Sequence, residues 1–102
     1  SRTVEIVKYI NEHLTEELSI DAIAEHFFIS KYHMMRSFKA DTGYTIGNYI
    51  LQKRLTLSKE LIQGGTPITE VCYLCGFKDY SNFSRQYKNL FHASPKETSR
   101  ML

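Results

Sequence analysis

Two cysteines three positions apart are the first candidates for metal or redox chemistry. Cys72 and Cys75 form a C-x-x-C pattern, which occurs both in zinc sites and in redox dithiols. A structural zinc ion takes four ligands, but the chain has no other cysteine, and its histidines do not show the H-x3–5-H spacing of a zinc site: His13, His26, His33 and His92. A redox dithiol would be expected beside a βαβ unit, and the sequence shows none. We therefore expect both cysteines to pack in a hydrophobic core, with no metal ion and no cofactor.

The other polar residues offer no catalytic set. The histidines are scattered among polar neighbours, and no arrangement of nucleophile, base and orienting group is apparent. No glycine-rich loop is present that would hold a phosphate group. We therefore predict that the protein is not an enzyme. Two free thiols are also typical of a protein in a reducing cytoplasm, which is the predicted location.

The spacing of apolar residues predicts a mainly helical chain. Apolar side chains recur at three- and four-residue steps, the period of one helix face, in two sets: Val4, Val7, Ile10 and Leu14, and Ile46, Ile50, Leu57 and Leu61. Several expected helices begin after a residue whose side chain favours a helix start: Ser19, Ser30, Thr45, Asp79 and Ser94. Thr66 is expected to cap a further helix, with Pro67 as its first residue. No useful stretch alternates in polarity, so we predict an all-α fold of about seven helices.

The chain contains an internal repeat. A shift of 48 residues, which becomes 49 after one insertion, aligns Ile20 with Ile68, Ile23 with Val71, Ala24 with Cys72, Ile29 with Phe77, Ser30 with Asp79, Met34 with Phe83, Arg36 with Arg85, Phe38 with Tyr87 and Lys39 with Lys88. Each copy is a short capped helix, a tight turn, a second cap and a helix with a basic face. This is the layout of a helix-turn-helix, whose second helix enters the DNA major groove. We expect residues 1–44 and 64–102 to form two such units, joined by a long central helix at 45–63.

The distribution of charge favours a polyanionic partner. Residues 1–30 contain two basic and six acidic residues, whereas residues 31–102 contain eleven basic and five acidic residues. An acidic start and a basic remainder suggest that one surface meets a polyanion, although a solvated charged face would give the same pattern. An apolar content of 42% excludes wholesale disorder, and no apolar segment approaches the roughly 20 residues that span a bilayer. We expect no membrane contact.

Motifs in both copies carry a family resemblance. The second copy contains Ile68, Thr69, Glu70, Val71, Gly76, Phe77, Ser81, Phe83, Arg85, Tyr87, Lys88, Phe91, Ser94 and Pro95, and the first contains Leu18, Ile23, Ala24, Ser30, Phe38, Lys39, Thr42 and Gly43. With Tyr49, Arg54 and Leu61 of the central helix, the sequence resembles the DNA-binding domain of AraC/XylS-type bacterial transcription regulators over almost its whole length. It departs from the pattern at Phe28 and His92, where glycine is usual, and at Ser58, where alanine is common. The resemblance implies two helix-turn-helix units on a rigid central helix, which bind one face of the DNA as a single chain.

Two sets of residues are the predicted DNA contacts. On the first recognition helix, the positions that face away from Met34 and Phe38 are Lys31, Tyr32, Met35, Arg36 and Lys39. The corresponding set of the second copy, with one flanking residue, is Tyr80, Ser81, Asn82, Ser84, Arg85 and Lys88. Arginine can form paired hydrogen bonds with guanine O6 and N7, whereas lysine suits phosphates, which position the protein without specifying a sequence. The alternatives are a solvated face or, for Arg85, an ion pair with Asp79 or Asp41.

We therefore predict sequence-specific binding of double-stranded DNA that regulates transcription. The two sets differ in sequence, so the site should be asymmetric, with two parts in adjacent major grooves. The resemblance further implies activation through RNA polymerase and a location at the nucleoid. Because Ser1 stands in place of an initiator methionine, we expect a fragment of a longer regulator whose dimerisation, if any, uses a missing domain. The alternative function is a helical protein-interaction module whose basic face binds an acidic partner.

Overall fold

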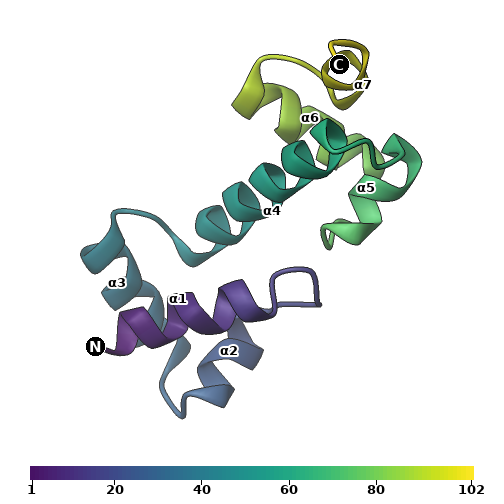
Figure 1. Cartoon of the computed structure of the whole chain (residues 1–102). Coiled ribbons are helices and arrows are strands. Elements are labelled where there is room, and N and C mark those ends of the chain that lie inside the picture. Colours follow the sequence, from purple (N-terminus) through teal and green to yellow (C-terminus); the bar gives the residue numbers. More distant parts are fainter. The chain divides into compact units, whose positions relative to one another are not determined.

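The fold consists entirely of helices and turns. A computed structural model describes all 102 residues. It contains seven helices in the order α1 (Arg2–Glu12), α2 (Ile20–His26), α3 (Lys31–Thr42), α4 (Ile46–Gln63), α5 (Ile68–Leu74), α6 (Tyr80–Phe91) and α7 (Pro95–Arg100) (Figure 1). The prediction of an all-α fold of about seven helices is confirmed. None of these helices combines the length and the hydrophobicity that a membrane span requires.

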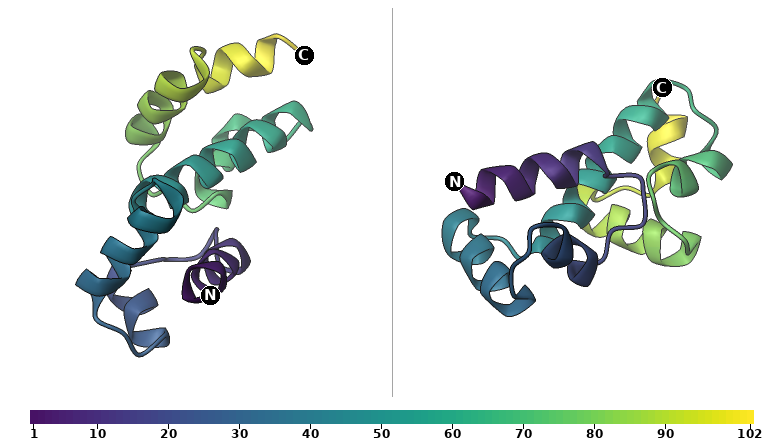
Figure 2. Two further views of the ribbon diagram at one scale, coloured as in Figure 1. Left: turned by 90° about the vertical axis from the view of Figure 1, so that its left-hand side faces the viewer. Right: turned by 90° about the horizontal axis from the view of Figure 1, so that it is seen from below.

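The chain divides into two compact units. The first is Ser1–Lys53 and the second is Arg54–Leu102. Helix α4 begins in the first unit and ends in the second, and the left-hand view of Figure 2 shows it as one uninterrupted coil. The segments 1–44, 45–63 and 64–102 stay a prediction about how the chain is organised.

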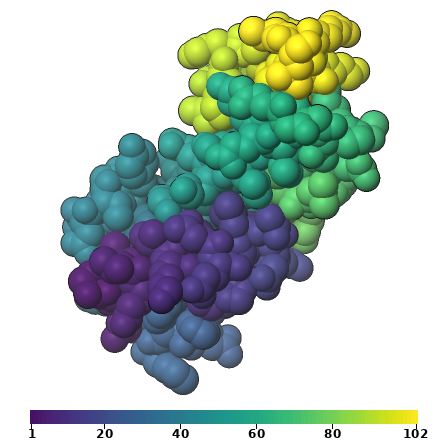
Figure 3. All heavy atoms as spheres, in the orientation of Figure 1, coloured from purple at the N-terminus to yellow at the C-terminus, as the bar shows by residue number.

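The core of the first unit is formed by four helices. Its buried residues are Ile6, Ile10, Ile23, Ala24, Met34, Phe38, Ile46 and Ile50. Helix α1 contributes through Thr3, Ile6 and Ile10, whereas Val4 is 66% exposed and Leu14 lies beyond the helix. The expected face was therefore wrong at Val4, whereas Val7, Ile10 and Leu14 pack against the core as predicted. The predicted set through Val4 and the observed set through Ile6 overlap on this helix at Ile10. Only packing against the neighbouring helices decides which of the two sets is more deeply buried. Figure 3 shows α1 at the surface of the first unit, where the face of α1 opposite its buried residues is open to solvent.

Caps that were predicted from the sequence fix the bounds of α2 and α3. The Ser19 hydroxyl accepts a hydrogen bond from the backbone N–H of Ala22 at 3.0 Å. The Ser30 hydroxyl accepts from the N–H of His33 at 3.5 Å. Gly43 ends α3 in the left-handed conformation, with φ at 82°, where glycine has no steric penalty. Local hydrogen bonds thus set where the first recognition helix begins and ends.

Helix α4 does not keep one buried stripe along its length. Ile46 and Ile50 are buried in the first unit, as predicted, but the buried residues of its second half are Leu55, Ser58 and Ile62. The predicted Leu57 and Leu61 are only half-buried. At about 100° per residue the second set does not continue the line of the first. Each half of α4 therefore turns a different side toward the core of its own unit, which a single helical period cannot predict.

The helices α6 and α7 of the second unit also begin at residues whose side chains cap them, whereas α5 does not. Asp79 accepts a hydrogen bond from the N–H of Ser81 at 3.0 Å and starts α6. Ser94 and Glu97 form a reciprocal capping box at the start of α7. Helix α5 begins one residue later than expected, because Pro67 rather than Thr66 occupies the N-cap and makes no side-chain cap bond. The predicted Thr66 cap was therefore wrong.

The core of the second unit is built around aromatic rings. Phe83 is fully buried, and its ring centroid lies 5.0 Å from that of Phe77 and 5.8 Å from that of Tyr87. The Tyr87 hydroxyl is satisfied by Thr98 Oγ1 at 3.0 Å, as a buried polar group requires. The contacts among these aromatic rings hold the inner face of α6 against the core, so its outer face is open to solvent.

The turn between α2 and α3 contains an unusual phenylalanine. Phe28, which stands where glycine is usual in the family, has a φ of 56° and is 94% exposed. In the second copy the corresponding turn contains Gly76, with φ at 93°. A left-handed backbone is unfavourable for a side chain by about 1–2 kcal/mol, and Phe28 gains little burial in return.

Phe28→Gly is expected to stabilise the protein by about 1 kcal/mol, since glycine removes the backbone strain and little packing is lost. Thermal unfolding followed by circular dichroism measures this. The matched control is Gly43→Ala, where φ is 82° and no atom would touch the new Cβ; this change should destabilise the protein by a similar amount. A lower melting temperature for Phe28→Gly would show that Phe28 has a packing role.

Candidate nucleic-acid interface

The outer face of α3 presents the predicted contact residues of the first unit. Met34 and Phe38 are buried on the inner face. On the outer face Tyr32 is 64% exposed and Met35 is 43% exposed, while Arg36 and Lys39 are also exposed. The structure therefore brings four of the five predicted side chains to one solvent-facing surface. An exposed aromatic ring and thioether beside two cations can contact both base edges and phosphates.

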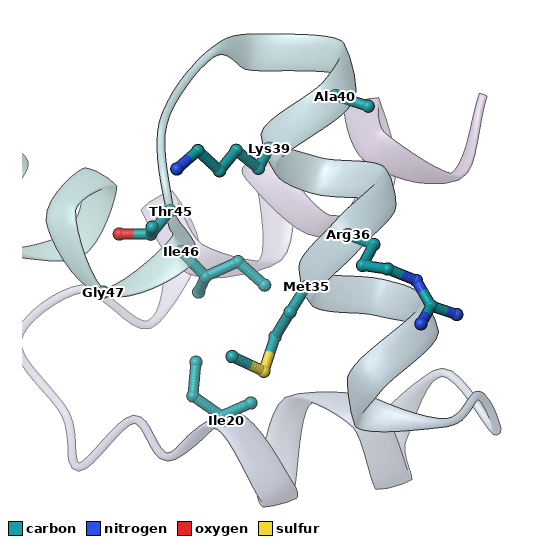
Figure 4. A pocket seen from close by; sticks show the side chains of 8 residues that line it. All are labelled: Ile20, Met35, Arg36, Lys39, Ala40, Thr45, Ile46 and Gly47. Atoms are coloured by element: carbon teal, nitrogen blue, oxygen red, sulfur yellow. The ribbon is translucent and has the colours of Figure 1, made fainter.

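A groove of about 410 Å³ borders this face (Figure 4). Its lining comes from three helices: Ile20, Met35, Arg36, Lys39, Ala40, Thr45, Ile46 and Gly47. Ile20, Met35 and Ile46 point toward one another and form an apolar floor, whereas the guanidinium of Arg36 points away. The Lys39 side chain extends toward the start of α4 at Thr45. The groove thus combines apolar surface with a cation at its edge.

Lys31 is the predicted contact of this set that forms an ion pair within the protein. Its ammonium lies 3.1 Å from Asp21 Oδ1 and 5.4 Å from the Tyr32 ring centroid. The hydrogen bond to Asp21, together with the charge of that carboxylate, raises the pKa of Lys31. Lys31 must therefore exchange Asp21 for a phosphate if it contacts DNA. Both groups are accessible to water, so the exchange requires little desolvation.

The outer face of α6 is the counterpart in the second unit. A hollow of about 400 Å³ is lined by Tyr80, Ser81, Ser84, Arg85, Lys88 and Asn89. Tyr80 is half-buried, and its ring lies edge-on to Phe83 with centroids 5.7 Å apart. Burial raises the pKa of Tyr80 above the ordinary tyrosine value. The structure brings five of the six predicted residues of this copy to one hollow, with Asn82 at its side.

Arg85 is held by a neutral partner. Its Nη2 donates a hydrogen bond to Asn82 Oδ1 at 2.9 Å. The two acids that were considered as alternatives have other partners: Asp79 caps α6, and Asp41 accepts from the Thr3 hydroxyl. The positive charge of Arg85 is therefore not neutralised by an internal ion pair, and it remains available to an anionic ligand.

Similarity to known proteins agrees with this geometry. A family model described as a helix-turn-helix domain matches residues 23–101. A crystal structure of a transcriptional regulator with an AraC-type DNA-binding domain, from Chromobacterium violaceum, superimposes with a TM-score of 0.85 at 29% sequence identity. The superposition covers 96% of this chain and 88% of that one. The chain belongs to the AraC family.

Two relatives of known name are similar in sequence. The multiple antibiotic resistance protein MarA of Escherichia coli K12 is 31% identical over 91 residues, which cover 88% of this chain and 72% of MarA. The transcriptional activator RhaS of Escherichia coli O139:H28 is 31% identical over 98 residues, which cover 95% of this chain and 35% of RhaS. The chain thus spans only about a third of RhaS.

Membership of the AraC family decides between the two predicted functions. The family consists of transcription regulators, and its helix-turn-helix domain binds DNA in a sequence-specific manner. It is a non-enzymatic family. The chain is therefore a DNA-binding domain of a family of transcription regulators, as predicted, rather than a helical module for an acidic protein.

Both cysteines of this AraC-type domain lie in the core of the second unit. Cys72 and Cys75 are fully buried, and the Cys72 thiol donates to the carbonyl of Phe77 at 4.0 Å. Burial, reinforced by the neighbouring Cys72 sulfur, raises the pKa of Cys75 to about 11, and burial also raises the pKa of Cys72. Raised pKa values keep both groups as unreactive thiols near neutral pH. This is the core packing predicted from the sequence.

The double substitution Cys72→Ala and Cys75→Val is expected to leave DNA affinity nearly unchanged and to lower stability modestly, because it alters packing but removes no ligand-binding group. Gel-shift titration and thermal unfolding measure the two effects. Because of the raised pKa of Cys75, the native protein should also react slowly with iodoacetamide at pH 8, and rapidly only after unfolding. Loss of DNA binding after treatment with a chelator would instead indicate a metal site.

Sequence reasoning missed some residues of both hollows. Ile20, Thr45 and Gly47 line the groove beside α3, and Asn89 lines the hollow beside α6. The residues of the first group lie at the starts of α2 and α4, so the periodicity of α3 alone gives no sign of them. The Thr45 hydroxyl, which accepts from the N–H of Asn48 at 3.0 Å, is the one signal that marks this helix start in the sequence.

Proposed function

We propose that α3 and α6 each read part of one DNA site through their outer faces. The proposed contacts are Lys31, Tyr32, Met35, Arg36 and Lys39 in the first unit, and Tyr80, Ser81, Asn82, Ser84, Arg85 and Lys88 in the second. The observation that carries the proposal is that both helices, in equivalent places of the repeat, expose an arginine and a lysine beside a hollow.

The arginines are proposed to read bases and the lysines to contact phosphates. Arginine forms paired hydrogen bonds with guanine in the major groove, and this is the commonest specific contact. Lys39 and Lys88 lie near the ends of their helices and are exposed. The Lys88 ammonium is 3.9 Å from Glu97 Oε1, and both side chains are exposed, so Lys88 can exchange this surface ion pair for a phosphate. Phosphate contacts add affinity for every sequence.

The proposed site is asymmetric. Tyr32 and Met35 have Ser81 and Ser84 as their counterparts, so apolar contacts in one unit are replaced by hydroxyls in the other. Different side chains favour different bases, and one chain therefore reads two different subsites. Because the single helix α4 joins the two units, we also propose that the subsites lie in adjacent major grooves of one duplex.

The wider role is proposed from the relatives. RhaS is named as a transcriptional activator, and activation through contact with RNA polymerase is the corresponding role for this domain. The full regulator would act in the cytoplasm, at the nucleoid, and any dimerisation would use a part outside these 102 residues.

Selection of duplexes from a random pool, followed by salt titration of the best one, tests the proposal. The logarithm of the binding constant should fall linearly with the logarithm of salt concentration, with a slope of about −0.9 per phosphate contacted. Lys39→Ala should reduce the magnitude of the slope by about one and weaken all duplexes alike. Failure to enrich any sequence from the pool would refute base reading, and an unchanged slope would remove Lys39 from the phosphate contacts.

A further inference from the structure

The side chain of Asn82 lies beside Arg85 on α6 rather than within the hollow. Asn82 is half-buried, and its Oδ1 accepts the 2.9 Å hydrogen bond from Arg85 Nη2. The two residues are three positions apart, and such pairs share one face of a helix. Asn82 does not line the hollow, whereas Arg85 does. The side-chain amide of Asn82 is therefore placed to hold the Arg85 guanidinium in one orientation.

This arrangement does not recur in the first copy. The repeat aligns Arg36 with Arg85 and, at the same shift, His33 with Asn82. His33 is exposed, and the Arg36 guanidinium points away from the groove of its unit. The amide acceptor beside the arginine is thus a feature of the second unit.

The hydrogen bond that Arg85 donates to Asn82 leaves the guanidinium able to recognise a base. The guanidinium has five N–H donors, and one of them satisfies Oδ1. The remaining donors suffice for the two bonds to guanine O6 and N7. A long arginine side chain loses much rotamer freedom when it binds, and a group that is already oriented loses less.

We propose that Asn82 is a positioning residue, which orients the Arg85 guanidinium for paired hydrogen bonds with one guanine. This inference rests on the proposed role of Arg85 in base reading. The sequence preference of the second unit then depends on a side chain that acts through another residue. As a direct DNA contact alone, Asn82 would add affinity for selected and altered duplexes alike, so the two roles differ in what they predict.

The test measures discrimination at one base pair. Two dissociation constants are measured, one for a duplex selected from a random pool and one for the same duplex with the guanine of the Arg85 subsite replaced. The ratio is that of the altered duplex to that of the selected duplex, so a larger ratio means stronger discrimination. Arg85→Ala locates that base pair, because its ratio should fall close to one there. Asn82→Ala should lower the ratio by about three- to tenfold. The matched control is Gln86→Ala, a half-buried amide residue of the same helix that neither lines the hollow nor takes part in this hydrogen bond; its ratio should stay that of the native protein.

A conservative variant separates positioning from a direct contact. Asn82→Asp retains an oxygen acceptor for Arg85 and adds a negative charge near the DNA. It should keep the ratio while weakening binding to all duplexes, including random DNA. This result, with a native-like melting temperature, supports the proposal.

Two outcomes would overturn it. If Asn82→Ala weakens selected and altered duplexes equally while Arg85→Ala still abolishes discrimination, Asn82 is a simple contact and the role of Arg85 stands. If Arg85→Ala changes the ratio at no base pair, base reading by Arg85 fails, and positioning fails with it.

Discussion

Alanine at both Arg36 and Arg85 is expected to reduce affinity for the selected duplex by about 2–6 kcal/mol, with a much smaller loss on random DNA. Each arginine should contribute about 1–3 kcal/mol of discrimination through paired bonds to guanine. The two lie in different units and share no partner, so their effects should add. Gel-shift titration of both single variants and the double variant measures these losses.

The matched control for the arginine variants is the pair Lys39→Ala and Lys88→Ala. These changes remove charges of the same sign from the same helices, but they should weaken selected and random duplexes alike. If the arginine variants also lost equal affinity on both kinds of DNA, the arginines would be phosphate contacts, and their assignment to base reading would be wrong.

Phe83→Ala is expected to destabilise the second unit by about 3–5 kcal/mol, the usual cost when a buried phenylalanine is truncated. Its ring lies among those of Phe77, Tyr80 and Tyr87, so the cavity would remove several ring contacts at once. A loss of this size is a large part of the 5–15 kcal/mol that stabilises a typical domain. Thermal unfolding should show a melting temperature lower by more than about 12 °C.

Tyr73→Ala is the control for this core variant, because Tyr73 is an aromatic residue of the same unit with 61% of its surface exposed. Its removal should change stability by no more than about 0.5 kcal/mol. Similar melting temperatures for the two variants would contradict the aromatic core of the second unit, whereas a loss confined to Phe83→Ala supports it.

The recognition helices could be predicted from the sequence because their signals are local. Ser19, Ser30, Asp79 and Ser94 cap the helices that were expected to follow them. A cap bonds to a backbone N–H two or three residues away, so a short stretch of sequence is enough to find it. The internal repeat then indicated which faces of these helices are equivalent.

Features that depend on packing or on distant residues were not predictable in the same way. The buried face of α1 and the shift of the buried side along α4 depend on which helices pack against them. The ion pair of Lys31 with Asp21 joins two helices across the turn, and periodicity within one helix does not show it. The exposure of Phe28 follows from a left-handed turn whose usual residue is glycine, and this departure was the only sign of it in the sequence.

A scan of every base pair in the selected duplex tests the central claim, that each recognition helix reads its own subsite. Each pair is substituted in turn, and affinities are measured for the native protein, Arg36→Ala and Arg85→Ala. We predict two separate blocks of sensitive base pairs, with Arg36→Ala removing sensitivity within one block and Arg85→Ala within the other. A single block, or two variants that lose sensitivity at the same base pairs, would contradict the account.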